Sequence, residues 1–501
     1  KAINRKVKNM KYFSTRDHEK KSFDSAYVIK HGLADDGGLF IPDSVPTLTE
    51  AEIRSLCEKT YPERAAFILS KYLTDYTYEE LLADSKDAYC ENSFPGGAAP
   101  LKKLGSDLFS LELWHGPTAA FKDMALQIMP RLLSRALVKT GETNTALILV
   151  ATSGDTGKAA LEGYKDIDRI KIEGFYPVDG VSKVQKLQMA TQTGNNVKVC
   201  AIRGNFDDAQ NGVKKIFSDK DAREKLAESS YILSSANSIN WGRLAPQIVY
   251  YVSAYCDLLK AGEIAYGDTV NVCVPTGNFG NIFAAYLAKR MGLPIGKLIC
   301  ASNSNNVLTD FLATGTYDRN RKFHMTMSPS MDILISSNLE RLLFFTSDAD
   351  KTAGYMKELS ATGRYTVSDE VKALIAENFA GYFADEDETA TTIRNFYENE
   401  HYLADTHTSV ALCCAEKYRK DTGDDRKMIV ASTASPYKFA ADVYRSITGK
   451  CASADTGALN DLTALTGVPI PYPLCGLDRR EVRFSEVINP DEMLKSVYEF
   501  L

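Results

Sequence analysis

The sequence lacks several features that would indicate common classes of protein. No stretch reaches the roughly 18 consecutive apolar residues of a membrane span. No run of Lys and Arg forms a basic stripe and the net charge is −6, so neither nucleic acid nor a membrane surface is a favoured partner. The N-terminal segment 1–17 also lacks the apolar core of a signal peptide. We therefore expect a cytoplasmic protein that binds a small molecule.

Metal-binding and disulfide patterns are missing as well. The ten cysteines form no CxxC pair, and the six histidines show no metal-ligand spacing. Cys200, Cys273 and Cys300 lie in apolar, strand-like runs, where a reduced thiol behaves as a small hydrophobe. We predict neither a disulfide framework nor a metal site.

The pattern of apolar residues predicts an α/β protein. Short β-branched runs alternate with amphipathic stretches, which is typical of parallel sheets covered by helices. Two groups of strands, hence two parallel-sheet lobes, are the simplest account. The first group is 144–152, 170–177, 195–204 and 231–237, and the second is 108–114, 269–275, 297–303 and 427–434.

We divide the chain into four parts on this basis. Residues 1–9 precede the first methionine, carry no apolar pattern and are treated as a leader outside the fold. Ligands of open α/β sheets bind beyond the carboxyl ends of the strands, so functional residues are expected in the loops after them. The parts are an N-terminal cap region (10–100), a small lobe (101–265), a large lobe (266–450) and a C-terminal extension (451–501).

The segment "VPTGNFGN" at 274–281 joins a predicted strand to a predicted helix. Glycine lets the backbone approach an oxygen-rich ligand, and the free N–H groups at a helix start attract an anion. The segment therefore predicts a phosphate site, although an ordinary strand-to-helix turn is the alternative. The residues concerned are Gly277, Asn278, Phe279, Gly280 and Asn281.

Lys122, in "WHGPTAAFKDMALQ", opens a helical stretch after another strand. A lysine near a helix N-terminus and beside Phe121 is disfavoured as a cation, so we expect a lowered pKa and an accessible neutral amine. A Schiff-base lysine needs that property. A surface lysine with a solvated amine is the alternative.

A second strand-to-helix turn, "ATSGDTGKAA" at 151–160, is rich in hydroxyl groups. Ser153, Thr156 and the backbone amides of 154–157 are candidates to hold a carboxylate or phosphate. A nucleotide-binding P-loop is disfavoured because Thr152 stands where its first glycine belongs and Ala159 follows the lysine. An ordinary capped turn is the remaining alternative.

Thr433, in "ASTASPYKF", supplies a hydroxyl at the end of the last predicted strand. Alone it is an ordinary turn residue. Together with an amine, a hydroxyl-rich loop and a phosphate loop it forms a set suited to pyridoxal phosphate, which needs an imine partner, a phosphate site and a partner for its ring nitrogen.

Six ordered segments resemble the threonine synthases of the long bacterial and fungal type. This family has the tryptophan-synthase-like fold of pyridoxal phosphate enzymes (fold type II), with the cofactor between two lobes. The resemblance runs from "YFSTRD" (12–17) to "TASPYKF" and covers most of the chain. The other segments are "HGPTAAFKD", "TSGDTG", "SANSINWGR", "PTGNFGN" and "PSMDILISSNLER".

The resemblance implies a role for each candidate residue. Lys122 would link covalently to the cofactor, loop 277–281 would bind the cofactor phosphate, and Thr433 would bond to the pyridine nitrogen. Asp155 would flank the cofactor ring, where many relatives have Asn. The substrate carboxylate would lie on Ser153 and Thr156, and the substrate phosphate on Asn237, Ser238 and Arg243.

The implied reaction converts O-phosphohomoserine and water to L-threonine and phosphate, in a monomer or homodimer. A serine or threonine dehydratase, or another β-replacing enzyme of this fold, is one alternative. It is disfavoured because "NSINWGR" supplies a second phosphate site. A non-catalytic ligand-binding homologue is the other alternative, and it would most simply have lost Lys122, which is present.

Overall fold

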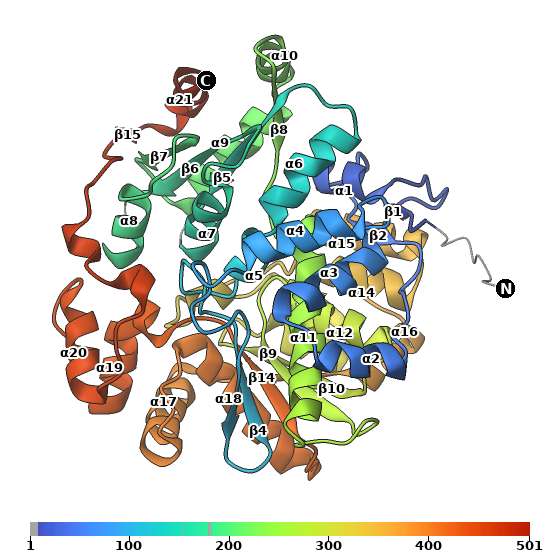
Figure 1. The fold of residues 1–501 in the computed structure, drawn as a ribbon, viewed down its shortest axis with the longest axis vertical. Helices are drawn as coiled ribbons and strands as arrows, with labels where there is room; N and C mark the ends of the chain where they lie inside the picture. Colours follow the sequence, from blue (N-terminus) through green and yellow to red (C-terminus); the bar gives the residue numbers. More distant parts are fainter. Residues whose placement is uncertain (1–8, 153, 179–180, 182) are drawn as a thin grey trace.

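Two main sheets organise the chain. The computed structural model describes residues 9–152, 154–178, 181 and 183–501. Figure 1 shows strands β5 to β8 in the upper part of the molecule and β4, β9, β10 and β14 in the lower part. The strand orders are β15-β7-β6-β5-β8 and β13-β10-β9-β14-β4-β3. All pairs are parallel except β3 with β4, so the prediction of two parallel-sheet lobes is confirmed.

All eight predicted strands form, and they fall into the two predicted groups. Three more strands, β3, β13 and β15, complete the sheet edges. They are partly exposed, so they carry little of the apolar signal that marks a buried strand. The five-stranded sheet contains β15 (Val487–Ile488), β7 (Val197–Ile202), β6 (Ile170–Pro177), β5 (Thr145–Ala151) and β8 (Tyr231–Ser234). The six-stranded sheet contains β13 (Phe379–Phe383), β10 (Ile295–Ser302), β9 (Val270–Pro275), β14 (Met428–Ser432), β4 (Leu108–Glu112) and β3 (Leu101–Leu104).

Strand pairing differs from the predicted lobe boundaries at two places. Strand β4 lies within the proposed small lobe 101–265 but pairs with β14 in the six-stranded sheet. The predicted grouping of strands had already placed 108–114 with the strands of this sheet, so the lobe boundary and not the grouping differs from the pairing. In the proposed extension 451–501, β15 pairs with β7 and so extends the five-stranded sheet.

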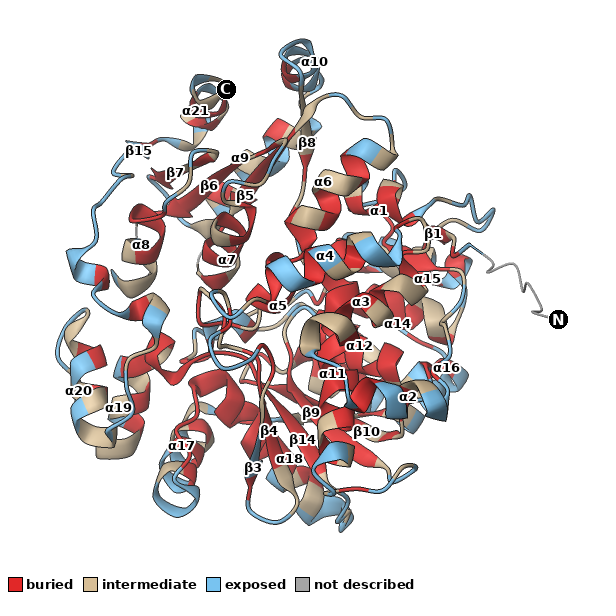
Figure 2. Cartoon of the chain, viewed as in Figure 1, coloured by how far each residue is buried: buried red, intermediate tan, exposed pale blue. Residues whose placement is uncertain are grey.

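The helices cover both faces of the sheets. Helix α18 packs against β9, β10 and β14, and α11 packs against α3 and α12. Figure 2 shows α11 and the strands of both sheets as mostly buried. The other helices before residue 230 are α1 (Ser25–His31), α2 (Glu50–Cys57), α3 (Tyr61–Tyr72), α4 (Tyr78–Ala88), α5 (Asp123–Leu126), α6 (Met129–Lys139), α7 (Asp155–Tyr164), α8 (Lys183–Ala190), α9 (Phe206–Ser218) and α10 (Lys220–Glu228). Those after it are α11 (Trp241–Lys260), α12 (Gly280–Arg290), α13 (Val307–Thr314), α14 (Leu339–Thr346), α15 (Ala349–Thr362), α16 (Asp369–Asn378), α17 (Glu386–Glu400), α18 (Thr406–Thr422), α19 (Ala440–Thr448), α20 (Gly457–Thr466) and α21 (Met493–Phe500).

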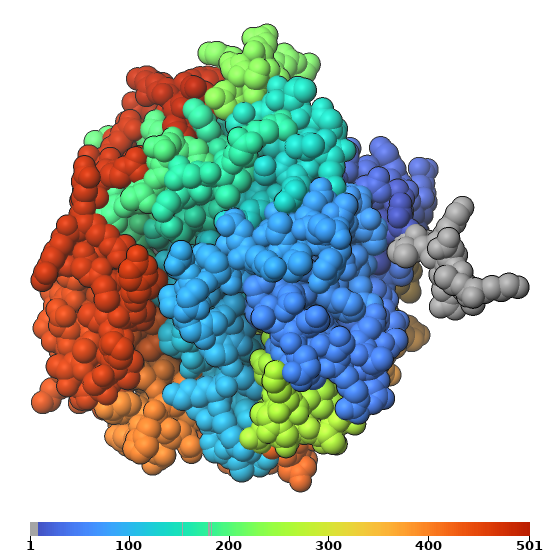
Figure 3. Space-filling view, in the orientation of Figure 1, coloured from blue at the N-terminus to red at the C-terminus, as the bar shows by residue number. Residues whose placement is uncertain are grey.

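The two ends of the chain cover opposite sides of the molecule. In Figure 3 the N-terminal region (blue) covers the right side, and the C-terminal segment (red) covers the left side. The N-terminal region is fixed by a two-stranded antiparallel sheet, β1 (Tyr12–Ser14) with β2 (Phe40–Pro42). Its Tyr12 ring lies 5.4 Å from the Trp241 ring, so aromatic packing fastens this region to helix α11.

None of the helices within the described ranges has the length and apolar character needed to cross a membrane. Cys200, Cys273 and Cys300 are fully buried in their strands, as predicted.

Candidate active site

Three predicted cofactor contacts follow three neighbouring strands. Strands β9, β14 and β4 are adjacent and parallel, so their carboxyl ends lie at one edge of the six-stranded sheet. Loop 277–281 follows β9, Thr433 follows β14, and the segment with Lys122 follows β4. The backbone N–H of Phe121 donates to the carbonyl of Thr433 at 2.8 Å. This hydrogen bond holds the segments of Lys122 and Thr433 side by side.

Lys122 is the N-cap residue of the short helix α5. Its Nζ lies 3.5 Å from Ser330 Oγ and 3.9 Å from Asp155 Oδ2, and the side chain is 11% exposed. Burial lowers the pKa of the Lys122 amine, and the charge of Asp155 opposes that shift. The predicted direction is therefore confirmed.

The predicted cause of this shift is only partly right. The Lys122 amine lies over the ring of Phe121, 5.1 Å from its centroid. An aromatic face attracts a cation, so Phe121 does not disfavour the charged amine. Loss of solvent is the main reason for the lowered pKa.

The backbone of loop 277–281 has its carbonyl groups paired and its amides free. The carbonyl of Gly277 accepts from Ser336 Oγ at 2.6 Å, and that of Asn278 accepts from the backbone N–H of Asn338 at 3.0 Å. Within the described part of the chain, none of the five N–H groups of this loop has an acceptor. Phe279 has φ +63° at the start of α12, a conformation found in anion-binding backbone turns.

Side chains around this loop add two further observations. Asn281 Oδ1 accepts from the hydroxyls of Tyr250 at 2.7 Å and Tyr251 at 2.5 Å, so the amide is held rigidly, whereas its Nδ2 has no partner in the described ranges. A Cβ atom placed on Gly277 would lie 2.9 Å from the carbonyl oxygen of Ser330. Only glycine allows this approach without a displacement.

In the other turn, between β5 and α7, a side chain of the turn accepts hydrogen bonds from the backbone N–H groups. The hydroxyl of Thr152 accepts from the backbone N–H groups of Gly154 and Gly157, each at 3.0 Å. Thr156 is half-buried in the first turn of α7. Ser153, predicted to hold the substrate carboxylate, lies outside the described residues.

Asp155 is the first residue of α7 and forms a buried ion pair with Lys438. Lys438 Nζ lies 2.9 Å from Asp155 Oδ1, and neither side chain is more than 2% exposed. Burial would raise the pKa of the Asp155 carboxyl, but Lys438 and Lys122 outweigh it and hold that pKa well below its ordinary value. Asp155 is therefore an anion beside the lysine amine.

Sequence reasoning did not identify Lys438 as a site residue. Its Nζ also donates to Gln188 Oε1 at 2.8 Å and to the carbonyl of Thr118 at 3.3 Å. Lys438 lies in the quoted segment "TASPYKF", but the acceptors that bury its charge come from three distant parts of the sequence. The signal available was a lysine beside apolar residues in that segment.

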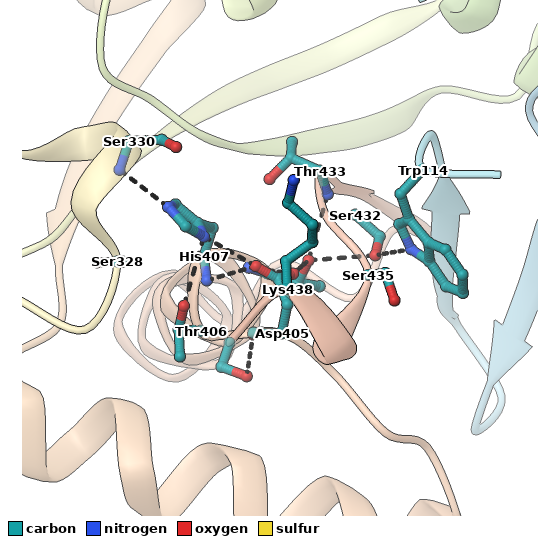
Figure 4. Close-up of polar contacts among 12 residues, drawn as sticks. Trp114, Ser328, Ser330, Asp405, Thr406, His407, Ser432, Thr433, Ser435 and Lys438 are labelled. Carbon is teal, nitrogen blue, oxygen red and sulfur yellow. Dashed lines mark hydrogen bonds and ion pairs between the residues drawn. The ribbon is translucent and has the colours of Figure 1, made fainter. Parts of the chain in front are cut away.

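Thr433 is 6% exposed, and its position is shown in Figure 4. The backbone N–H of Thr433 donates to Thr408 Oγ1 at 3.3 Å. Its own hydroxyl makes no hydrogen bond to any residue that the structure describes, so it is available to a ligand.

The segment 237–243 brings one strong anion-binding group toward the site. Arg243 is 4% exposed and donates from Nη1 to the carbonyl of Ala236 at 3.0 Å, while its Nε has no partner among the residues that the structure describes. Burial lowers the pKa of Arg243 to about 10, and its charge contributes to the lowered pKa of Lys122. Asn237 is exposed and Ser238 is half-buried, so Arg243 is the most enclosed of the three predicted residues.

No cluster of three or more His, Cys, Asp or Glu side chains suited to a metal ion occurs among the described residues. The site instead combines an amine of lowered pKa with free N–H groups and a buried guanidinium. This arrangement suits an anionic organic ligand held by its phosphate or carboxylate oxygens.

Comparisons with known families and proteins agree with this geometry. The family described as "Pyridoxal-phosphate dependent enzyme" matches residues 95–433. "Threonine synthase N terminus" matches 11–89, and "Threonine synthase, C-terminal" matches 408–498. The threonine synthase of Pseudomonas aeruginosa is 37% identical over 492 residues, covering 97% of both chains. The chain belongs to the threonine synthase family.

Solved structures of threonine synthases have the same fold. The pyridoxal-phosphate-bound enzyme from Brucella melitensis is 38% identical with a TM-score of 0.86, and the yeast enzyme is 32% identical with a TM-score of 0.87. Each comparison covers 98% of both chains. The predicted fold, type II of the pyridoxal phosphate enzymes, is thereby confirmed.

A longer relative also matches. Human "Threonine synthase-like 1" is 42% identical over 437 residues, which is 85% of this chain. This chain spans only 58% of that relative's length.

In this member of the threonine synthase family, the residues of the candidate active site fit pyridoxal phosphate. Of the six buried side-chain nitrogen donors without a partner in the described chain, three belong to residues of the site or to their direct partners, in addition to the free amides of loop 277–281. A phosphate group and a charged ring substituent would satisfy such donors. The three donors are Arg243 Nε, Asn281 Nδ2 and Gln188 Nε2.

Proposed function

We propose that this chain catalyses the pyridoxal-phosphate-dependent conversion of O-phosphohomoserine and water to L-threonine and phosphate. The observation that carries the proposal is the set of three adjacent strand ends, which present an amine, a hydroxyl and a turn with five free amides at one edge of a sheet. Family membership and the threonine synthase structures support the same reaction.

Each site residue has a role in this proposal. Lys122 would hold the cofactor covalently, loop 277–281 its phosphate, and Thr433 its ring nitrogen, with Asp155 beside the ring. When bound, pyridoxal phosphate withdraws electrons from the carbon atoms next to the substrate amine. A neutral hydroxyl such as that of Thr433 cannot keep the ring nitrogen protonated as a carboxylate would.

The Lys122 amine is the proposed acid–base group of the reaction. Its lowered pKa gives a neutral fraction that can take a proton from the substrate Cα and move one at Cβ. Asp155, held ionised by Lys438, keeps an anion next to this amine and so favours its return to the protonated form. The two lysines thus share one carboxylate.

Arg243 is proposed to bind the leaving phosphate group of the substrate, together with Asn237 and Ser238. A buried guanidinium with a free Nε–H offers a bidentate contact to phosphate oxygens. The substrate carboxylate is assigned to Ser153 and Thr156, at the start of α7.

The test is a substrate comparison with the purified holoenzyme. O-Phosphohomoserine is expected to yield equal amounts of threonine and phosphate, measured by amino-acid analysis and a phosphate assay. L-Serine and L-threonine should give little 2-oxo acid. Rapid 2-oxo acid formation without phosphate release from O-phosphohomoserine would instead establish a dehydratase.

The attachment site has its own test. Borohydride reduction of the holoenzyme followed by peptide mapping should place the cofactor label on Lys122. A label on another lysine, such as Lys438, would overturn the assignment of Lys122.

Three further predictions from the sequence stay proposals: a cytoplasmic location, a monomeric or homodimeric state, and the four-part division of the chain. Sedimentation equilibrium gives the oligomeric state. Limited proteolysis near residues 100, 265 and 450 tests the division, because cleavage concentrates where few contacts cross a boundary.

A further inference from the structure

A buried carboxylate at the start of α18 connects several parts of the site. Asp405 is the N-cap residue of α18 and is 0% exposed. It accepts from the backbone N–H groups of His407 at 2.9 Å and Thr408 at 3.1 Å. It also accepts from two side chains, the Nδ1 of His407 at 2.9 Å, which Figure 4 shows, and the hydroxyl of Thr408.

The first branch runs through His407 to Ser330. His407 Nε2 accepts from the backbone N–H of Ser330 at 3.1 Å, so the ring proton is on Nδ1 and is donated to Asp405. Ser330 lies between two predicted cofactor contacts. Its Oγ is 3.5 Å from Lys122 Nζ, and its carbonyl oxygen approaches the backbone of Gly277.

The second branch runs through Thr408 to the end of β14. Thr408 Oγ1 accepts from the backbone N–H of Thr433 at 3.3 Å and lies 3.1 Å from Ser432 Oγ. Ser432 Oγ in turn accepts from Trp114 Nε1 at 2.9 Å. This branch therefore holds the backbone of Thr433 and ties it to the segment that leads to Lys122.

Helix capping alone does not account for these contacts. An N-cap side chain needs to accept only one backbone hydrogen bond, as the exposed Asp385 does from the N–H of Glu388 at the start of α17. The two side-chain bonds of Asp405 lead to the two sides of the site. Burying a carboxylate is costly unless each oxygen is bonded, so the geometry of this network is strongly constrained.

We propose that Asp405 is a positioning residue. Acting through His407 and Thr408, it sets the spacing between the cofactor contacts at Lys122, loop 277–281 and Thr433 without touching the cofactor itself. The inference rests on the proposed function only for the assignment of those contacts.

The Thr408 branch is tested with a matched pair of variants. Thr408→Val removes the hydroxyl at nearly constant shape, and Thr408→Ser keeps it. In the holoenzyme, Thr408→Val is expected to shift the absorbance maximum of the bound cofactor and to lower kcat about tenfold with little change in KM. Thr408→Ser should recover the wild-type spectrum. Identical spectra and kcat in wild type and Thr408→Val would overturn the Thr408 branch.

The His407 branch is tested on cofactor affinity. His407→Phe keeps a ring but leaves the Ser330 N–H without an acceptor, and should raise the Kd for pyridoxal phosphate about tenfold in equilibrium dialysis. An unchanged Kd would overturn this branch.

The role of Asp405 itself is tested by comparing two N-cap residues. Asp405→Asn should raise the Kd for pyridoxal phosphate and shift the absorbance maximum of the bound cofactor. Asp385→Asn alters an N-cap away from the hydrogen-bond network and should do neither. Equal effects of the two substitutions would show that Asp405 is only a helix cap. If Asp405→Asn does not fold, the Thr408 and His407 variants decide the proposal.

The absorbance and Kd readouts need cofactor binding but not the proposed substrate, whereas kcat and KM need both. A wild-type enzyme that binds the cofactor but leaves O-phosphohomoserine intact would refute the proposed reaction alone. Absorbance and Kd effects that follow the hydrogen-bond network would still support the role of Asp405.

Discussion

Two turns of this protein are similar in sequence and different in structure. Both "VPTGNFGN" (274–281) and "ATSGDTG" (151–157) join a buried parallel strand to a helix through glycines and short polar residues. In the first, none of the five amides of 277–281 has an acceptor in the described chain. In the second, the hydroxyl of Thr152 accepts from Gly154 and Gly157, and Asp155 brings a negative charge to the helix start.

The difference teaches what makes a strand-to-helix turn an anion site. Glycine content and the helix dipole are common to both turns. The two turns differ in whether a side chain of the turn itself already accepts hydrogen bonds from the backbone N–H groups. The first turn is open to a phosphate, and the second is closed by its own threonine and needs Lys438 to balance its carboxylate.

The largest effect on stability is expected from removing the lysine that neutralises Asp155 at the second turn. Lys438→Met leaves Asp155 buried with only the more distant Lys122 as a cation, and should reduce the free energy of unfolding by about 3–5 kcal/mol. Urea unfolding measures this loss. The double variant Asp155→Asn/Lys438→Met removes both charges and should recover most of the stability. If the double variant is as unstable as Lys438→Met, the loss of stability comes from lost packing and not from an unpaired charge.

The same pair predicts a pH dependence. The folded-state pKa of Asp155 is lowered, so its contribution to stability is present above the ordinary Asp range near pH 4 and is lost as the pH falls through the lower folded-state value. Wild type should therefore lose more stability between about pH 5 and 2 than the double variant does.

The next largest effect distinguishes the binding site of the substrate phosphate from that of the cofactor phosphate. Arg243→Ala removes a buried guanidinium outside both turns and should cost about 2–5 kcal/mol in substrate binding, or roughly 10² or more in kcat/KM for O-phosphohomoserine. Cofactor content, read from the absorbance of the bound group, should be unchanged. Cofactor loss, or phosphate release at the wild-type rate, would refute the assignment.

A smaller effect is expected from filling the open turn. Gly277→Ala places a Cβ atom against the carbonyl of Ser330 and should weaken cofactor binding by about 1–3 kcal/mol. Gly354→Ala is the control, because a Cβ atom there meets nothing within 4 Å and alanine suits the interior of α15. Dialysis of both variants measures the Kd. Equal affinities would mean that the turn does not hold the cofactor.

The smallest effect is expected from opening the closed turn. Thr152→Val leaves the amides of Gly154 and Gly157 without their acceptor and should cost about 1 kcal/mol of stability. Added sulfate should raise the Tm of this variant more than that of wild type, because the freed amides can bind it. Thr152→Ser keeps the hydroxyl and serves as the control. An equal response of Thr152→Val and Thr152→Ser to sulfate would contradict the comparison.

The sequence predicted the elements of the site better than their environment. Lys122, Thr433 and loop 277–281 were found because each follows an apolar strand, and parallel strands bring such loops to one edge. Lys438, Asp405 and His407 were missed because their importance lies in partners far away in sequence, such as Asp155 and Ser330. The cause assigned to the Lys122 pKa was partly wrong for the same reason, since burial is not a local property.

The sequence by itself determined the alternation of strands and helices, the two groups of strands and the family, because apolar periodicity and ordered motifs are properties of short segments. Only the tertiary structure decided that β15 extends the five-stranded sheet, that the amides of one glycine turn are free in the described chain while the other turn is bonded by Thr152, and that Lys438 neutralises Asp155. Pairing of strands, burial and charge balance depend on groups that are distant in the chain and meet only when it folds.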